Sequence, residues 1–186
     1  MTKWMFSALT LVACGLTAMA ADNEIKVKEG DKAPNISLPA TSVDKVLPDA
    51  KDAKSLDLAA LKGKKHVVLF FYPKAMTGGC TIESCGFRDI TADLAKLDTV
   101  VIGISIDKLS DQQKFTDKES LNFPLLADSD GKITKEFGVM AGTRPVSQRV
   151  TFIIDKEGVI RKIYTKVTPK THPKEVIDFV EKELAK

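Results

Sequence analysis

A nearly continuous apolar run, His66–Tyr72, constrains the fold more than any other feature of the sequence. It lacks polar alternation, as is typical of a strand buried on both faces. A loop follows, then apolar residues at helical spacing over 78–97, and then a second apolar run at 99–106. Strand, helix and strand in this order predict a βαβ unit with parallel strands, and hence an α/β protein.

Two of the three cysteines, Cys80 and Cys85, lie at the start of the expected helix. Free N–H groups and the helix dipole at such a position favour an anion, here the reactive thiolate form of Cys80. Five helical residues give a rise of roughly 7.5 Å and a rotation of about 140°, so the two Cα atoms lie about 8.7 Å apart. A disulfide requires a separation below roughly 7 Å. We therefore interpret Cys80 as the nucleophile and Cys85 as a partner that reaches it only after local unwinding.

The helical pattern also predicts which way each thiol faces. Cys80 lies almost in line with Phe87, seven residues on, and should face the core, while Cys85 should face away. Gly86 and the pair Gly78–Gly79 weaken the helix here, by about 1 kcal/mol for each glycine in a helix interior.

Periodicity and turn residues predict the remaining elements. The expected strands are 36–38, 123–127 (strand or extended segment), and a hairpin formed by 149–155 and 159–164. The expected helices are a short turn from Ser55 to Leu61 with Ser55 as its cap, 110–121, 132–137 and 173–184. We expect 43–54 to be a surface loop or loose hairpin and Gln112 to lie on a solvated helix face.

The motif Pro73-x-x-x-Thr77-x-x-Cys80, followed by Cys85 and by Phe87-Arg88-Asp89, resembles the peroxiredoxins of the bacterioferritin-comigratory (Q-type) branch. Further stretches that carry the resemblance are Gly30–Pro34, Leu61–Lys65, Phe123–Asp128 and Arg149–Asp155. The similarity covers roughly residues 29–184. The chain departs from the branch at Ala75-Met76, where acidic residues are usual, and at Gly78, where proline is usual.

The resemblance implies a thioredoxin-like fold with a central mixed sheet flanked by helices, here with an N-terminal extension. It implies reduction of hydrogen peroxide and alkyl hydroperoxides at Cys80, and then an intramolecular disulfide with Cys85. It also implies recycling by thioredoxin or another dithiol protein, with no metal, flavin or haem cofactor. We expect a monomer.

Thr77 and Pro73 lie in the loop that leads to the nucleophile. By resemblance, the Thr77 hydroxyl contacts the sulfur and the peroxide, although a plain helix cap is the alternative. Pro73 is expected to shape and shield this loop, and it also ends the strand before it.

Arg149 opens an apolar strand, where a half-buried arginine needs an anionic partner. By resemblance it lies beside the nucleophilic sulfur, stabilises the thiolate and donates to peroxide. A surface ion pair is the alternative role, and Arg144 and Arg161 are alternative cations. Glu83 and Arg88 are expected either to support the site by hydrogen bonds or to form an exposed helical pair.

Composition excludes several other classes. A net charge of +3 with scattered lysines does not indicate nucleic-acid binding. His66 and His172 are isolated in the sequence and are expected at the surface or at a strand end, so no metal set can be built from them.

The first twenty residues differ from the rest of the chain. Lys3, an apolar stretch over 5–16 and Ala18-Met19-Ala20 are typical of a secretory signal, too short to span a membrane. We expect cleavage after Ala20, a single domain over 21–186 and a periplasmic location. A lipobox ending at Cys14, which would anchor the protein through a lipid, is the alternative.

Two other functions stay open on the sequence. One is an exported thiol–disulfide oxidoreductase that acts on proteins, although the usual Cys-x-x-Cys is missing. The other is a copper-binding thioredoxin-like module, although that class generally places three residues between its cysteines and this chain has four.

Overall fold

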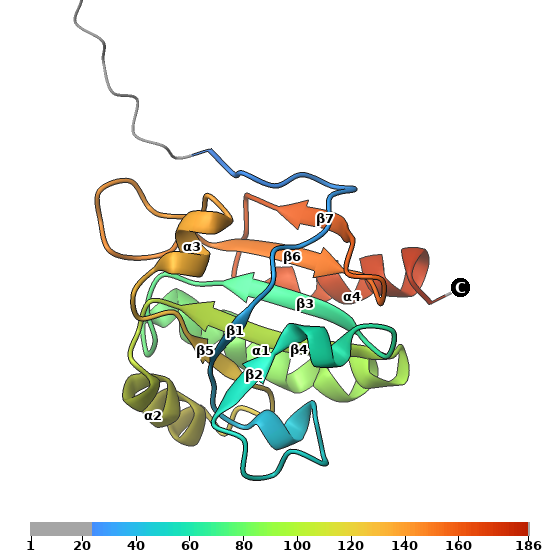
Figure 1. The fold of residues 1–186 in the computed structure, drawn as a ribbon, viewed down its shortest axis with the longest axis horizontal. Coiled ribbons are helices and arrows are strands. Elements are labelled where there is room, and N and C mark those ends of the chain that lie inside the picture. Colours follow the sequence, from blue (N-terminus) through green and yellow to red (C-terminus); the bar gives the residue numbers. More distant parts are fainter. Residues whose placement is uncertain (1–23, 186) are drawn as a thin grey trace, which may run out of the picture.

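The computed structural model describes residues 24–185, so the expected signal segment 1–20 and Cys14 lie outside the described residues. In the described part, five strands form a mixed sheet in the order β5-β4-β3-β6-β7, and β1 and β2 form a small antiparallel sheet (Figure 1). The strands are β1 (Ser37–Pro39), β2 (Ser55–Asp57), β3 (His66–Phe71), β4 (Thr99–Ser105), β5 (Leu125–Ala127), β6 (Val150–Ile154) and β7 (Ile160–Tyr164). The helices are η1 (Val43–Lys45), η2 (Leu58–Leu61), α1 (Gly78–Lys96), α2 (Leu109–Glu119), α3 (Lys132–Glu136) and α4 (His172–Glu183).

β3 is the central strand, which explains its unbroken apolar sequence. It pairs in parallel with β4 and antiparallel with β6, and every residue of it is buried. Alternate side chains of β3 and of the residue after it enter two core clusters on opposite faces of the sheet. One cluster takes Val67, Leu69 and Phe71, and the other takes Val68, Phe70 and Tyr72.

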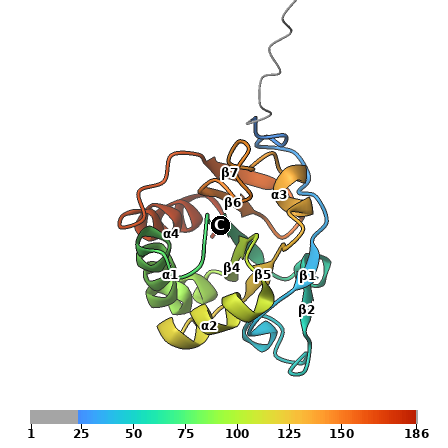
Figure 2. The ribbon, with the colours of Figure 1, turned by 90° about the vertical axis from the view of Figure 1, so that its left-hand side faces the viewer.

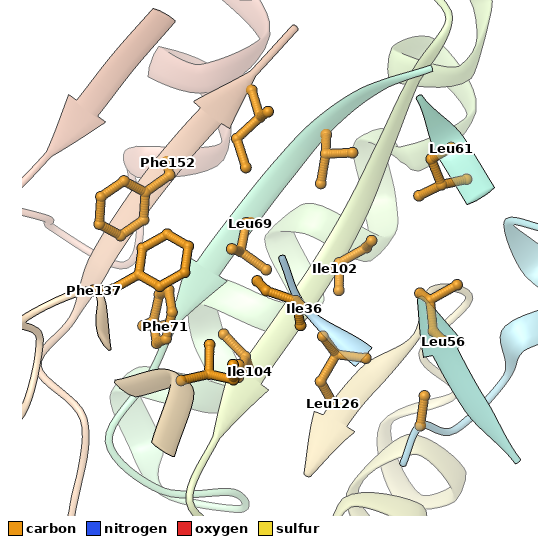
Figure 3. Packing of buried hydrophobic residues seen from close by; sticks show 14 of the residues in the cluster. Ile36, Leu56, Leu61, Leu69, Phe71, Ile102, Ile104, Leu126, Phe137 and Phe152 are labelled. Carbon is orange, nitrogen blue, oxygen red and sulfur yellow. The ribbon is translucent and has the colours of Figure 1, made fainter. Parts of the chain in front are cut away.

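Helices cover the two faces unequally. Figure 2 shows α1, α2 and α4 on one side of the sheet, and α3 with the β1-β2 pair on the other. The second face is packed with aliphatic and phenylalanine side chains that converge from both sheets and from α3 (Figure 3). Those labelled there include Ile36, Leu56, Leu69, Phe71, Ile102, Phe137 and Phe152. The first face carries Cys80 among its buried residues.

Most of the expected elements are confirmed. The βαβ unit is present as β3-α1-β4 with parallel strands, and the hairpin is present as antiparallel β6 and β7. The helices expected over 110–121, 132–137 and 173–184 are α2, α3 and α4 with small shifts at their ends. No helix in residues 24–185 is long and apolar enough to cross a membrane.

The turn-rich segment over 43–54 and a helical turn that ends at Leu61 are present, but the expectation for residues 43–61 is wrong in two details. Ser55 begins strand β2 rather than capping a helix, and Asp57 caps η2 by accepting a hydrogen bond from the Ala59 N–H at 2.8 Å. The segment expected to be a surface loop or loose hairpin contributes Val43 and Val46 to the core. Val43 and Val46 have the spacing of one helical turn, but the charged residues around them indicated a solvated segment.

Two polar residues expected at the surface are buried. Gln112 is fully buried because its amide has partners inside: it donates to Ser105 Oγ and to the Leu126 carbonyl at 2.9 and 3.0 Å. His172 is also fully buried, with its Nε2 2.8 Å from Thr151 Oγ1. Burial of polar groups is tolerated where hydrogen bonds replace those lost from water.

Candidate active site

Sheet topology brings the ends of two distant segments together. β6 runs antiparallel to β3, with Val150 opposite Phe71, so the start of β6 meets the end of β3. Arg149 immediately precedes β6, and the loop from Tyr72 to α1 immediately follows β3. Residues 69 positions apart in the sequence therefore converge at one edge of the sheet.

Cys80 lies in the first turn of α1 and is only 1% exposed. Arg149 Nη2 donates a hydrogen bond to Cys80 Sγ at 3.2 Å. A cation therefore lies beside the sulfur, and the sulfur lies at the N-terminus of a helix. Both features stabilise a thiolate.

Glu83 holds this arginine in place from one turn further along α1. Its carboxylate accepts a hydrogen bond from Arg149 Nη1 through Oε2, and its side chain is completely buried. Burial raises the pKa of Glu83 to about 7, against the opposing influence of the Arg149 charge. The guanidinium thus spans a buried carboxylate and the cysteine sulfur, which fixes its orientation.

Gly79 makes room for this arrangement. A Cβ atom at this position would lie 3.3 Å from Arg149 Nη2 and 3.6 Å from Pro169 Cγ. The first of these is a tight contact, so a side chain at Gly79 would press on the group that donates to Cys80.

Hydrogen bonds anchor the loop before α1 to α2 and to the segment between β4 and α2. The buried Tyr72 hydroxyl donates to Gln112 Oε1, and the Ala75 N–H donates to Asp107 Oδ2 at 2.7 Å. Pro73 is half-buried in this loop, and its expected role in shaping and shielding the loop stays a prediction. Met76 has a φ of 60°, a left-handed conformation that is uncommon outside glycine.

Thr77 occupies the N-cap position of α1, but its side chain makes no cap hydrogen bond. Its exposed hydroxyl donates to the Lys74 carbonyl at 2.9 Å. The helix-cap alternative is therefore wrong for the side chain, and the expected contact with the sulfur and the peroxide stays a prediction.

Cys85 faces different partners from Cys80, and both thiols are free. Its Sγ donates to Glu119 Oε2 at 3.7 Å, and Arg88 Nη1 lies 3.7 Å from the same sulfur. Burial raises the pKa of the Cys85 thiol, Arg88 lowers it, and Glu119 and Asp89 raise it further. Both cysteines lie within the unbroken helix α1, in the arrangement that keeps them apart.

Glu83 and Arg88 do not act as a pair with each other in this structure. Glu83 supports Arg149, whereas Arg88 bonds Asp89, approaches the Cys85 sulfur and donates to the Glu119 carbonyl at 2.7 Å.

The alternative cations lie elsewhere. Arg161 is exposed and pairs with Asp155 at 3.5 Å, and Arg144 is an exposed residue of the loop before β6. Within residues 24–185, no three His, Cys, Asp or Glu side chains gather closely enough to hold a metal ion.

A cavity of about 330 Å³ lies at the opposite end of β3. Its lining includes Leu58, Lys62, Val67 and Gly158, and none of the residues around Cys80. Cys80 therefore does not open into this cavity.

Sequence reasoning missed Glu119, Gln112 and His172 as parts of the site and its surroundings. Each is separated from its partner by many residues, as with the 34 positions between Cys85 and Glu119. For Gln112 and His172, the only signal was a polar residue within an amphipathic pattern. Such a residue is equally typical of a solvated position.

The fold and the site define a class: a thioredoxin-like protein with a buried cysteine at a helix N-terminus, bonded by the arginine that precedes a neighbouring strand. A family model described as the AhpC/TSA family matches residues 29–163. A Coxiella burnetii protein named as a bcp peroxiredoxin is 40% identical over 159 residues, covering 82% of this chain and 98% of its own. Peroxiredoxin Bcp of Escherichia coli K12 is 36% identical over 160 residues, covering 83% and 96% of the two chains.

The similarity to a solved structure also supports this family. The crystal structure of the peroxidoxin BcpB from Mycobacterium tuberculosis is similar with a TM-score of 0.72 and 30% identity, over 84% of this chain and 97% of that one. The chain therefore belongs to the AhpC/TSA family and, within it, to the bacterioferritin-comigratory branch of the peroxiredoxins.

Proposed function

We propose that this protein is a thiol-dependent peroxidase that reduces hydrogen peroxide and alkyl hydroperoxides, with Cys80 as the attacking residue. The observation that carries the proposal is the buried Cys80 sulfur at the start of α1, 3.2 Å from Arg149 Nη2. The peroxiredoxin names of its relatives support the same reaction.

In the first step, the Cys80 thiolate attacks one peroxide oxygen and the O–O bond breaks. The leaving oxygen takes up the proton that the thiol had released and departs as water or an alcohol, and Cys80 becomes a sulfenic acid. Arg149 stabilises the sulfur anion and the charge that develops on the leaving oxygen. Because Glu83 already orients the guanidinium, little reorganisation is needed at the moment of reaction. Thr77 would join this step by turning its hydroxyl from the Lys74 carbonyl towards the peroxide.

In the second step, the first turns of α1 loosen and Cys85 condenses with the Cys80 sulfenic acid. The product is the Cys80–Cys85 disulfide of an atypical two-cysteine enzyme. An external dithiol protein, thioredoxin or a periplasmic equivalent, then reduces this bond by thiol–disulfide exchange.

We also propose that the protein is a periplasmic monomer whose first twenty residues are a cleaved signal. The apolar stretch followed by Ala18-Met19-Ala20 supports export. The N-terminal mass of protein from a bacterial periplasmic fraction tests this: a start at Ala21 is expected, and a lipid adduct at Cys14 would replace the proposal by an anchored form. Sedimentation of the mature protein tests the monomer.

The function is tested by titrating the reduced mature protein with hydrogen peroxide and reading intact mass. One equivalent should remove two thiols and leave a species two mass units lighter, with Cys80 and Cys85 joined. In Cys80→Ser, peroxide consumption should be abolished, because the nucleophile is lost. In Cys85→Ser, one equivalent should be consumed, Cys80 should remain as an unpaired sulfenic acid, and dithiol-supported turnover should stop.

Three outcomes would contradict the proposal. Full activity of Cys80→Ser would remove Cys80 from its role, and normal cycling of Cys85→Ser would place the resolving thiol elsewhere. Insulin reduction faster than peroxide consumption would favour the protein thiol–disulfide oxidoreductase.

A further inference from the structure

Cys85 is tied to a second helix through two residues that touch its sulfur. Its Sγ donates to the Glu119 carboxylate at 3.7 Å, and Arg88 Nη1 lies 3.7 Å from the same sulfur. The same Arg88 nitrogen donates to the Glu119 backbone carbonyl at 2.7 Å. We call Cys85, Arg88 and Glu119 the resolving-thiol clasp.

The clasp joins α1 to the C-terminus of α2. Glu119 is the last residue of α2, and Ser120 after it turns away with a φ of 51°. Carbonyl groups in the last turn of a helix lack partners within the helix. Arg88 supplies one for Glu119, so the guanidinium fixes the backbone of α2 while the Glu119 side chain reaches back to the thiol.

From Phe87 onward, α1 has anchors other than the contact between Cys85 and Glu119. Phe87 is completely buried, and Asn122 Nδ2 donates to the Arg88 carbonyl at 3.1 Å while Asn122 Oδ1 accepts from Thr91. The part before the clasp begins with the exposed Gly78 and half-buried Gly79. Unwinding that carries Cys85 towards Cys80 therefore leaves the later turns in place but must break the contact between Cys85 and Glu119.

The charges around Cys85 favour its protonated form in the folded protein. Burial, Glu119 and Asp89 all raise the pKa of the thiol, and Arg88 opposes them. Lys118, next in the chain to Glu119, has its Nζ 4.0 Å from Glu119 Oε1 and reduces the field of that carboxylate. As a neutral thiol, Cys85 donates to Glu119 and is a poor nucleophile.

We propose that Glu119 is a positioning residue for the resolving step: it holds Cys85 as a thiol against the end of α2, and release of this contact limits the rate of disulfide formation. The inference rests on the proposed function of Cys85. In the step concerned, Cys80–SOH and Cys85–SH give the disulfide and water: an S–S bond forms, the S–O bond breaks, and the Cys85 proton leaves with the hydroxide. The Cys80 sulfur is reduced and the Cys85 sulfur is oxidised, so no further reactant is needed.

A slow release has a chemical consequence at Cys80. While Cys85 is held, the sulfenic acid persists and remains open to a second peroxide, which would convert it to sulfinic acid. Weakening the clasp should therefore protect Cys80 from irreversible oxidation at high peroxide.

The test separates the two steps in time. Reduced wild-type protein and Glu119→Gln are mixed with hydrogen peroxide, quenched at intervals with acid and analysed by intact mass. Sulfenic acid formation should depend on peroxide concentration and be equal in both proteins. Disulfide formation should be independent of peroxide and about three- to tenfold faster in Glu119→Gln, because the charged acceptor is lost.

A pH series distinguishes positioning from simple loosening of the fold. If Glu119 holds Cys85 in its protonated form, the rise of the resolving rate with pH should have its midpoint at lower pH in Glu119→Gln than in the wild type. Asp117→Asn is the matched control. It neutralises another carboxylate on the same turn of α2, and Asp117 bonds Gln113 rather than Cys85. This control should resemble the wild type in both phases.

The outcomes divide clearly. Equal resolving rates for wild type and Glu119→Gln, an unshifted midpoint, or the same acceleration in Asp117→Asn would each overturn the role of Glu119 while leaving the peroxidase intact. A wild type that consumes peroxide without forming the Cys80–Cys85 disulfide would overturn the proposed resolving step itself, and the inference with it.

Discussion

At the scale of single residues, Arg149 organises the site. Its guanidinium bonds Glu83 with one nitrogen and the Cys80 sulfur with another, at 3.2 Å for the latter. Burial lowers the pKa of Arg149, but the Glu83 carboxylate and the Cys80 sulfur raise it more, so the group stays charged. A planar fork meets both partners at fixed angles, which a lysine ammonium would not reproduce.

Arg149→Met is expected to slow the second-order reaction of Cys80 with hydrogen peroxide roughly a hundredfold, the usual effect of removing one transition-state donor. Rapid-quench alkylation of the remaining thiol measures this rate. The control is Arg161→Met, which removes an exposed arginine bonded to Asp155 and should react at the wild-type rate. An unchanged rate in Arg149→Met would show that another group stabilises the leaving oxygen.

At the scale of elements, two of the three glycines of α1, Gly78 and Gly86, have opposite surroundings. A Cβ on Gly78 would have no atom within 4 Å, whereas a Cβ on Gly86 would lie 2.7 Å from Pro173 Cγ of α4. The start of α1 at Gly78 is therefore unpacked, while the turn after Cys85 is docked against α4. Glycine weakens the helix at both positions, and of these two only Gly86 is required by packing.

Gly78→Ala should raise the stability of the first turn by about 0.5–1 kcal/mol and slow disulfide formation about two- to fivefold, because unwinding becomes harder. The resolving phase after a peroxide pulse measures the rate, and chemical denaturation measures the stability. Gly86→Ala is the contrasting variant, since overpacking against Pro173 should lower the free energy of unfolding by about 1–3 kcal/mol. If Gly78→Ala were more stable yet formed the disulfide at the wild-type rate, the first turn would not be the part that unwinds.

At the scale of the whole molecule, His172 lies where the sheet and two helices meet. It bonds Thr151 of β6 and packs edge-on against Phe87 of α1 and Tyr164 of β7. Burial lowers the pKa of His172 from the usual 6.5 to about 4, with Glu175 opposing this change and Arg149 adding to it. The histidine is therefore neutral in the folded protein at pH values where an unfolded chain would bind a proton.

Acid should accordingly weaken the fold through His172. Between pH 6.5 and about 4 the unfolded chain protonates this group and the folded one does not, so the free energy of unfolding falls with pH, by about 3 kcal/mol in all. Urea denaturation of wild type and His172→Gln at pH 7.5, 5.5 and 4.5 measures the difference; glutamine keeps a hydrogen-bonding group for Thr151.

The comparison with His172→Gln is needed because the titration of Glu83 changes the free energy of unfolding in the opposite direction as the pH falls. Its raised pKa means that the folded state takes up a proton near pH 7, before the unfolded state does, which favours folding as pH falls. The stability of the wild type relative to His172→Gln should rise with pH between about 4 and 6.5 and stay constant above 6.5. A pH-independent difference would exclude the neutral buried histidine as the acid-sensitive group.

Local patterns predicted most of the architecture. The apolar run of β3, the periodic stripe of α1 and the turn at Gly158 each depend on neighbours in the chain, so their types and approximate limits could be inferred. The core position of the segment 43–54 and the strand at Ser55–Asp57 could not be inferred. Their few apolar residues are buried only because they pack against the opposite sheet, which the local sequence does not show. Gln112 and His172 were misjudged for the same reason: a polar side chain is buried only where a distant partner accepts its hydrogen bond.

The sequence alone determined that a cysteine stands at a helix start after a buried strand, and that a second cysteine five residues on cannot bond it within that helix. These conclusions follow from backbone geometry, which acts over a few residues. Only the tertiary structure decided that Arg149 meets Cys80, that Glu83 turns inward to hold it and that Cys85 rests on Glu119. Those contacts join segments brought together by antiparallel strand pairing and helix packing, and the free energy of that packing belongs to the whole chain rather than to any stretch of it.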